Sequence, residues 1–271
     1  MNKFIIILCL VYLELLASDT LMVGVVPQME PSEIQNRWQP FLVELENKIG
    51  VKLELRYYKT IPLFEKGLKD GEIDIAFMNP YHAVMAHEWQ KYRPIIHDKK
   101  PLVGILVVKN GGSITNISDL NNQIIAFPAP NAFAASLYMR ALLDKQEHIK
   151  FKPIYVKTHS NVYRNVIFGM MPAGGGVNNT FKREDLSVQE KLKIIYSTKS
   201  VAAHPICLHP RISKSRAELI KKTILYMGEN SQYNKILDDI QIPNPVGADY
   251  KSEYAPLKKL KIEDYVVEDT K

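Results

Sequence analysis

One segment, residues 124–143, constrains the fold most, because it changes from a strand pattern to a helix pattern within a few residues. Its sequence is IIAFPAPNAFAASLYMRALL, in which a short apolar run ends at Pro128 and Pro130 and a helix-forming run follows Asn131. This order predicts a strand, a tight turn and a helix with Asn131 at the N-cap. The first backbone N–H groups of such a helix lack intrahelical acceptors and favour a small anion.

Strands and helices alternate before this segment. The helix predicted at residues 33–49 has its apolar residues on one face, and Gly50 follows as a stop signal. Strands are expected at residues 21–26, 51–57, 73–77 and 101–109, and two further helices at residues 61–70 and 81–90. This alternation predicts a mostly parallel sheet with helices on both faces.

A second α/β set begins after the break at residues 110–112, Asn-Gly-Gly. Its strands are expected at residues 124–127, 154–156, 173–177 and 193–196, and its helices at residues 133–143 and 161–168. An apolar stretch at residues 206–208 returns the chain to the first half, before a helix at residues 215–227 and a loop-rich tail.

Two similar α/β halves joined by two crossings indicate two lobes with a cleft between them. We expect the first lobe to comprise residues 19–110 and 206–271, and the second lobe residues 111–205. In open parallel sheets, ligands bind outside the carboxyl ends of the strands, so the site is expected where those ends face the cleft.

Residues 1–18 have the pattern of an export signal, with Lys3, an apolar run of about ten residues and Ala17-Ser18 as a cleavage site. An uncleaved membrane anchor is the alternative. After cleavage the chain keeps one cysteine, Cys207, so no internal disulfide can form. Export without disulfides is common in the bacterial periplasm. For Cys207 itself, a buried inert thiol is favoured over a reactive one.

The formal net charge is +6, and the lysines and arginines are scattered rather than clustered. With export, this distribution argues against nucleic acid and fits an anionic small molecule or a membrane surface better. The sequence contains no GxSxG, HExxH or CxxC motif. His82 and His87 are five residues apart and therefore lie on different helix faces. We expect no enzymatic activity, no cofactor and no metal site.

Polar and small residues follow the predicted strands at the cleft. Asn79 and Tyr81 can offer polar groups from the first lobe. His159, Ser160 and Asn161 stand at a helix start, where His159 has either a donor role or a purely structural one. Further along, Gly175 lies in a run of three glycines, and glycine in a strand often marks close approach of backbone or ligand. Asn178 follows this run with an amide that can donate hydrogen bonds.

Several long motifs occur in a characteristic order: GVVPQMEP, FEKGLKDGEIDIAFMNPYH, FPAPNAFAAS, THSNVYRNV, PAGGGVNNTF and HPR. On these motifs the chain resembles the extracytoplasmic solute-binding proteins of the phosphate/phosphite/phosphonate ABC-transporter family. The resemblance implies a two-lobed periplasmic binding protein fold of type II, with a hinge and the ligand enclosed between the lobes.

The resemblance also implies site residues. The phosphonate group would be held at the start of the second lobe's first helix, here Asn131, Ala132 and Phe133, and the family's histidine matches His159. The chain departs from the aminoalkyl-phosphonate binders in three places. It lacks hydroxyl side chains at residues 132–134, has Asn161 in an often acidic position, and has no carboxylate in the glycine run. These departures fit a different or smaller oxyanion, or a less charged ligand.

The first functional hypothesis is therefore a monomeric periplasmic protein that captures a small oxyanion and delivers it to the membrane permease of an ABC transporter. The same closed form would serve a sensory protein that docks on a membrane histidine kinase or cyclase. A phosphoester hydrolase is the third hypothesis, although no pair of carboxylates is placed for acid/base catalysis.

Overall fold

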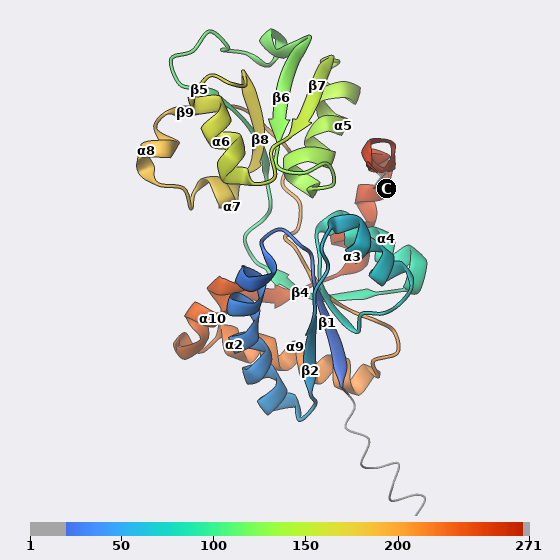
Figure 1. Cartoon of the computed structure of the whole chain (residues 1–271). Coiled ribbons are helices and arrows are strands. Elements are labelled where there is room, and N and C mark those ends of the chain that lie inside the picture. The colour runs from blue at the N-terminus through green and yellow to red at the C-terminus, as the bar shows by residue number, and fades with distance from the viewer. Residues whose placement is uncertain (1–19, 268–271) are drawn as a thin grey trace, which may run out of the picture.

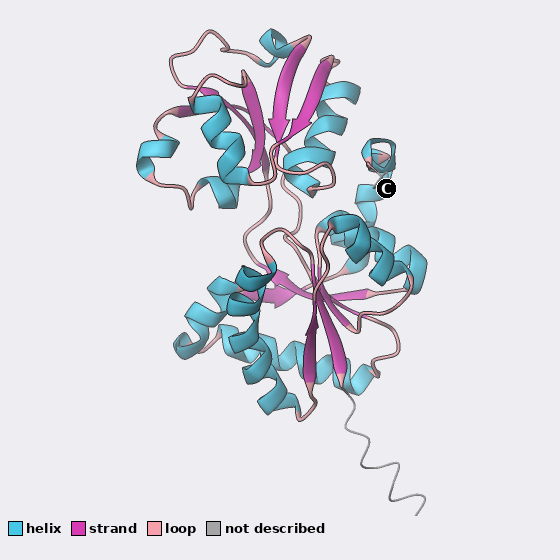
Figure 2. Ribbon diagram, viewed as in Figure 1, coloured by secondary structure: helices cyan, strands magenta, loops and turns pink. Residues whose placement is uncertain are grey.

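The structure is a computed structural model that describes residues 20–267. The export signal expected at residues 1–18 lies outside the described residues. The chain forms two lobes, each an α/β unit built around one sheet (Figures 1 and 2). Within residues 20–267, no helix has both the length and the apolar character needed to cross a membrane.

The first lobe contains a six-stranded sheet in the order β11-β4-β10-β3-β1-β2. Strand β1 is parallel to β2 and β3, whereas β10 is antiparallel to β3 and β4, and β11 is antiparallel to β4. The strands are β1 (Leu21–Val25), β2 (Leu53–Arg56), β3 (Ile75–Phe77), β4 (Arg93–Asp98), β10 (Ile206–Leu208) and β11 (Pro245–Gly247).

Helices cover both faces of this sheet. On one side α2 packs against α9 and α10, and on the other α3 packs against α4. Helix α2 buries Trp38, Phe41 and Leu45 on one face, and Gly50 ends the helix in the left-handed conformation. The helices are α2 (Pro31–Ile49), α3 (Ile61–Lys69), α4 (Pro80–Gln90), α9 (Lys214–Gly228) and α10 (Asn234–Asp239), with the short turn η3 (Ser231–Tyr233) before α10.

The second lobe contains a five-stranded sheet in the order β7-β6-β8-β5-β9. Its strands are β5 (Gly104–Lys109), β6 (Gln123–Phe127), β7 (Phe151–Tyr155), β8 (Ala173–Val177) and β9 (Leu192–Ser197). Its helical elements are η1 (Ile117–Leu120), η2 (Phe133–Leu137), α5 (Tyr138–Lys145), α6 (His159–Ile167), α7 (Asn178–Phe181) and α8 (Leu186–Gln189). Helix α5 continues directly from the π-helical turn η2.

Both sheets are mixed, whereas the sequence predicted mostly parallel sheets. In the second sheet β6 is parallel to β7 and β8, but β5 is antiparallel to β8 and β9. The strands that run against the others are β5 in the second sheet and β10 and β11 in the first, and β5 and β10 are the first strands after each crossover. The parallel strands are those that feed a helix, as the sequence pattern indicated.

The crossing into the second lobe lies earlier than the sequence suggested. We expected the boundary after residue 110, but β5 hydrogen-bonds to β8 and β9, so the strand belongs to the second sheet. The two crossovers are therefore residues 99–103 and 198–205. They are joined to each other by paired backbone hydrogen bonds between Leu102 and Val201, of 2.9 and 3.0 Å.

The glycine run in β8 lets neighbouring elements approach the sheet very closely. A Cβ atom on Gly175 would overlap the backbone oxygen of Ala135, and one on Gly174 would overlap the Val162 side chain. On the adjacent strand, a Cβ on Gly104 would overlap the backbone oxygen of Ala134. The position of η2 on the sheet therefore depends on missing side chains at Gly175 and Gly104.

The C-terminal residues form a segment that contacts both lobes. We call residues 249–267 the C-terminal strap; it comprises η4 (Tyr250–Tyr254), η5 (Ala255–Leu260) and η6 (Ile262–Tyr265). The tail expected to be loop-rich is thus a series of short helical turns. It leaves β11 in the first lobe and reaches α5 of the second lobe (Figure 1).

We predict that Gly175→Ala destabilises the protein by roughly 1–3 kcal/mol, because overpacking forces either η2 or the strand to move. Gly247→Ala is the matched control, since its Cβ would meet only the flexible end of the Lys221 side chain, at 3.1 Å. Urea unfolding of both variants measures the difference. Equal unfolding free energies for the two variants would contradict the close approach described here.

Candidate functional site

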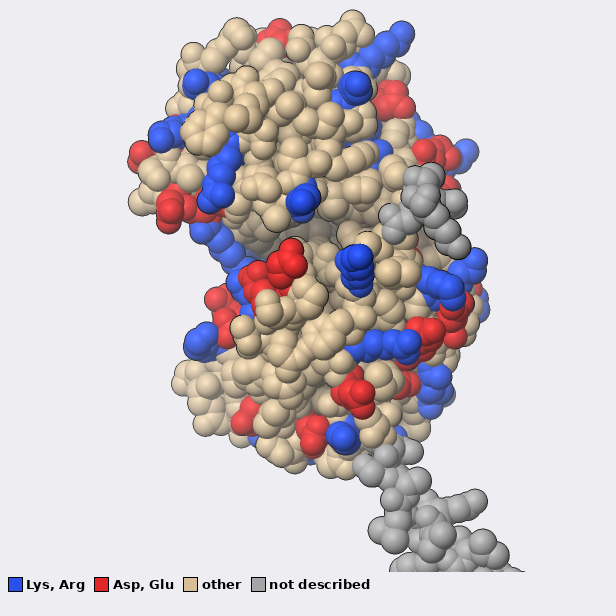
Figure 3. All heavy atoms as spheres, viewed as in Figure 1, with Lys and Arg blue, Asp and Glu red and all other residues tan. Residues whose placement is uncertain are grey.

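Three helical elements of the second lobe begin at one edge of its sheet. Strands β6, β7 and β8 are parallel and adjacent, and each is followed by a helical start, in η2, α6 and α7 respectively. The carboxyl ends of parallel strands share one edge, so these three starts meet there. They line a cleft of about 660 Å³ whose other wall belongs to the first lobe. Figure 3 shows the hollow between the lobes on one side of the molecule.

The start of η2 supplies backbone donors. At the start of this turn, the backbone oxygen of Ala132 accepts hydrogen bonds from the N–H groups of Ser136 at 2.9 Å and Leu137 at 3.1 Å. The N–H groups of Phe133, Ala134 and Ala135 precede these donors and have no intrahelical acceptor. Residues 132–135 all line the cleft. The helical stretch of residues 133–145 therefore presents its positive end to the cavity.

The start of α6 supplies His159 and Ser160, which both line the cleft. His159 Nδ1 is buried and has no hydrogen-bond partner among the described residues. Burial lowers the pKa of His159 to about 4, so the ring is neutral at pH 7. Ser160 Oγ donates to Glu184 Oε1 at 2.5 Å, which leaves the Ser160 lone pairs but not its proton for a ligand.

Two polar residues follow β8 at the same edge. Asn179 and Thr180 line the cleft from α7. Asn179 Oδ1 is buried without a hydrogen-bond partner within residues 20–267, whereas Thr180 Oγ1 donates to the Val177 oxygen at 3.0 Å. A buried polar atom without a partner is costly, so Asn179 and His159 mark where an incoming polar ligand gains most.

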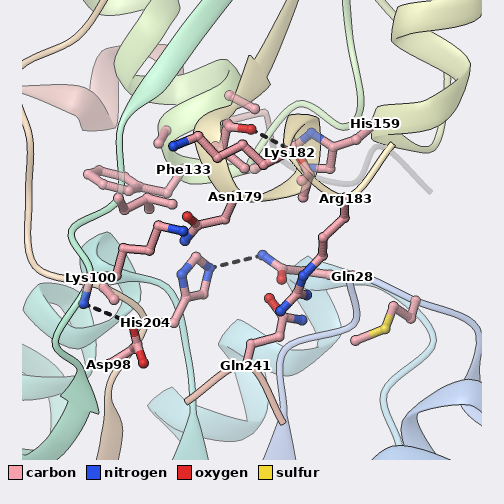
Figure 4. Close-up of a pocket in the computed structure, with 18 of the residues that line it drawn as sticks. Gln28, Asp98, Lys100, Phe133, His159, Asn179, Lys182, Arg183, His204 and Gln241 are labelled. Atoms are coloured by element: carbon pink, nitrogen blue, oxygen red, sulfur yellow. Dashed lines mark hydrogen bonds between the residues drawn. The ribbon is translucent and has the colours of Figure 1, made fainter. Parts of the chain in front are cut away.

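The first lobe contributes a second histidine. His204 lies on the crossover of residues 198–205, stacks on Phe77 with ring centroids 5.6 Å apart, and contacts Gln28 Nε2 through its Nε2 at 3.0 Å. Its pKa is lowered to about 3, first by burial and then by the neighbouring His82 and His159. Figure 4 shows His204 and Gln28 on the opposite side of the cavity from His159 and Phe133.

Charged residues surround the cavity in pairs. Arg37 pairs with Glu33 at 2.8 Å, and Arg183 of the second lobe pairs with Asp238 of the first lobe at 3.4 Å. Asp98 accepts the backbone N–H groups of Lys100 and Asn244, both at 2.8 Å. Lys100 and Lys182 also line the cavity. The cavity therefore offers hydrogen-bond donors from the backbone, from neutral side chains and from these two lysines.

Four of the ten predicted site residues line the cleft: Ala132, Phe133, His159 and Ser160. Asn79 and Tyr81 lie away from it. Asn79 caps α4 by accepting the His82 N–H at 2.7 Å, and Tyr81 is buried with its hydroxyl unpartnered among the described residues.

The other four predicted residues also have structural contacts elsewhere. Asn131 exchanges two hydrogen bonds of 3.0 Å with the backbone of Val267 in the strap. Asn161 Nδ2 donates to the Val156 oxygen at 2.9 Å. Asn178 Oδ1 accepts the Val103 N–H at 3.2 Å, and Gly175 packs under Ala135. Their polar groups serve the turn, the helix start and the crossover instead of the cavity.

Gln28, Asn179 and His204 line the cleft but are not among the ten predicted site residues. Gln28 follows β1 and Asn179 follows β8, so both stand at strand ends where the pattern itself placed the site. Asn179 could have been predicted, because it directly follows the predicted residue Asn178 and the chain reaches the cleft at Asn179. No local sequence pattern indicated that His204 lies at the cleft, because its position depends on the path of the crossover.

The chain matches a protein-family model described as "ABC transporter, phosphonate, periplasmic substrate-binding protein" over residues 23–254. Its fold is similar to that of a binding protein component of an ABC phosphonate transporter from Pseudomonas aeruginosa, with 14% identity, a TM-score of 0.76 and coverage of 90% of this chain and 86% of that chain.

Two further structures are similar. PhnD1 from Prochlorococcus marinus in complex with methylphosphonate is 17% identical, with a TM-score of 0.77 and coverage of 91% of this chain and 99% of that chain. A Xanthomonas citri protein bound to chloride ion is 12% identical, with a TM-score of 0.79 and the same coverage. At these identities the structural likeness establishes the fold, and it confirms the two-lobed type II architecture.

The two buried histidines predict an acid-sensitive stability. The unfolded chain binds protons on both rings below about pH 6.5, whereas the native rings stay neutral until about pH 4 and 3. The unfolding free energy should therefore fall as the pH falls from 6.5 to 4. In a His159→Gln, His204→Gln variant this loss should be smaller by roughly 2 kcal/mol or more.

Urea unfolding at pH 7 and pH 4.5 measures this loss. The control is His148→Asn, which replaces an exposed histidine at a positive φ of 53° with a residue that tolerates that conformation. Equal acid losses in the double variant and the unsubstituted protein would show that these rings do not stay neutral.

Proposed function

We propose that this chain, which belongs to the family of periplasmic substrate-binding proteins of phosphonate ABC transporters, captures a small phosphorus oxyanion between its lobes and releases it chemically unchanged. The observation that carries the proposal is the unpaired start of η2, with the N–H groups of Phe133, Ala134 and Ala135 at the cleft. A helix N-terminus of this kind binds phosphonate or phosphate oxygens through N–H groups and the helix dipole.

The neutral side chains complete the oxyanion site. His159 can donate from one ring nitrogen without carrying charge, and Asn179 and Thr180 lie at the neighbouring helix start. His204 and Gln28 face them from the first lobe. Closure of the lobes would bring both walls onto one ligand and exclude water, which strengthens each hydrogen bond.

Binding without chemistry fits this set of groups. The Ser160 hydroxyl donates to the Glu184 carboxylate and not to a histidine, so the cleft, as formed by residues 20–267, lacks the Ser–His pair of a serine hydrolase. We place the protein in the periplasm, reached through the export signal at residues 1–18, with the closed form docking on the permease of the transporter. The monomeric state is part of the same proposal.

The test is a calorimetric titration with phosphate, phosphite, methylphosphonate, 2-aminoethylphosphonate and sulfate. At least one phosphorus oxyanion should bind with one-to-one stoichiometry and raise the melting temperature with concentration. His159→Ala should weaken that binding at least about tenfold, because a hydrogen bond to a charged group contributes roughly 1.5–3 kcal/mol.

His148→Asn is again the control and should bind like the unsubstituted protein. Unchanged binding in His159→Ala would remove this histidine from the site, and no binding of any phosphorus oxyanion would refute the proposed function. Phosphorus NMR of the bound ligand after prolonged incubation should show no product, and a product would restore the hydrolase hypothesis.

A further inference from the structure

The lobes are joined by more than the two crossovers, because the C-terminal strap is attached to both. In the first lobe its buried Tyr254 donates to the Ala203 oxygen at 3.0 Å, and Glu253 pairs with His97 at 2.9 Å. Tyr250 stacks on His87 with centroids 3.7 Å apart. These contacts anchor η4 firmly beside the crossovers.

The far end of the strap is bonded to the second lobe. Arg140 Nη2 donates to the Tyr265 oxygen at 2.7 Å, and Lys145 pairs with Asp264 at 2.7 Å. The Tyr265 hydroxyl donates to Asp144, and the Val267 backbone exchanges two hydrogen bonds with Asn131. Arg140 also donates to the Pro130 oxygen at 2.8 Å, so the strap ends on the turn that leads into η2.

A second contact between the lobes lies across the cleft. Arg183 follows α7 in the second lobe and pairs with Asp238 of α10 in the first lobe. Figure 1 shows α7 and α10 on one side of the crossovers and the C-terminus on the other. A hinge rotation about the crossovers that brings α7 towards α10 would therefore widen the separation of the lobes on the strap side.

We propose that the C-terminal strap is a brake on closure: its contacts with α5 hold the lobes apart at the cleft and lower the affinity for the ligand. This inference rests on the proposed function for its ligand, but not for its effect on the lobes. A protein whose binding-competent state is less populated binds its ligand more weakly by that fraction. Releasing the strap from α5 thus increases both the closed population and the affinity.

The test variant is Lys145→Met, Asp264→Ala, Tyr265→Ala, which removes the Lys145–Asp264 ion pair and the Tyr265–Asp144 hydrogen bond and leaves the cleft residues intact. The matched control is Lys258→Met, which removes an ion pair of the strap with Glu88 inside the first lobe. Spin labels on Val43→Cys and Leu186→Cys report the separation of the lobes, since both positions are exposed and Cys207 is buried.

Without ligand, the labels should lie closer together in the strap variant than in the control, and methylphosphonate should bind it at least threefold more tightly. An unchanged or longer separation would overturn the proposal, as would unchanged or weaker binding. If methylphosphonate binds none of the proteins, the ligand assignment is wrong. The separation of the labels alone then tests the proposal for the strap.

Discussion

The close contact between the glycine strand β8 and the π-helical turn η2 is the constraint on which the site depends. Gly175 and Gly104 carry no Cβ where the oxygens of Ala135 and Ala134 approach the sheet. That approach sets the depth at which residues 133–135 present their N–H groups to the cleft. Any side chain at these two positions would raise the turn from the sheet and move the anion site relative to His159 and Asn179. Glycine here acts through packing, and its contribution to binding is indirect.

The cleft combines a positive backbone end with two neutral histidines, and Lys100 and Lys182 are among its lining residues. His159 and His204 remain neutral because burial disfavours the imidazolium form. At the rim, Glu33 and Asp238 are paired with arginines, and Asp98 accepts backbone N–H groups. Selectivity in such a site depends on the number and direction of hydrogen-bond donors, since each unmatched buried donor costs about 1–3 kcal/mol.

Local patterns were sufficient for the elements and for the edge where the site forms. The strand, turn and helix of residues 124–143 lie where periodicity placed them. The predicted N-cap Asn131 is wrong, because its side chain hydrogen-bonds to the Val267 backbone and the helical stretch begins at Phe133 after Ala132. The helix predicted at residues 161–168 begins two residues earlier, at His159, with Thr158 as its N-cap. The β4 and β11 strands, the position of β5 and the role of His204 were not predictable, because they follow from pairings between residues far apart in the chain. Asn131, Asn161 and Asn178 show the same limit. Each is a polar residue at a strand end, and each spends its amide on backbone groups that only the tertiary structure brings near.

The strand order of the first sheet has a consequence for how the chain assembles. Strand β10, from residues 206–208, lies in the centre between β3 and β4, and β4 pairs with no strand except β10 and β11 among the described residues. The second lobe, by contrast, is formed by one continuous stretch. A growing chain can therefore complete its second lobe while the first remains an unfinished sheet of β1, β2 and β3. The first lobe, and with it the cleft, can be completed only when nearly the whole polypeptide is available to fold.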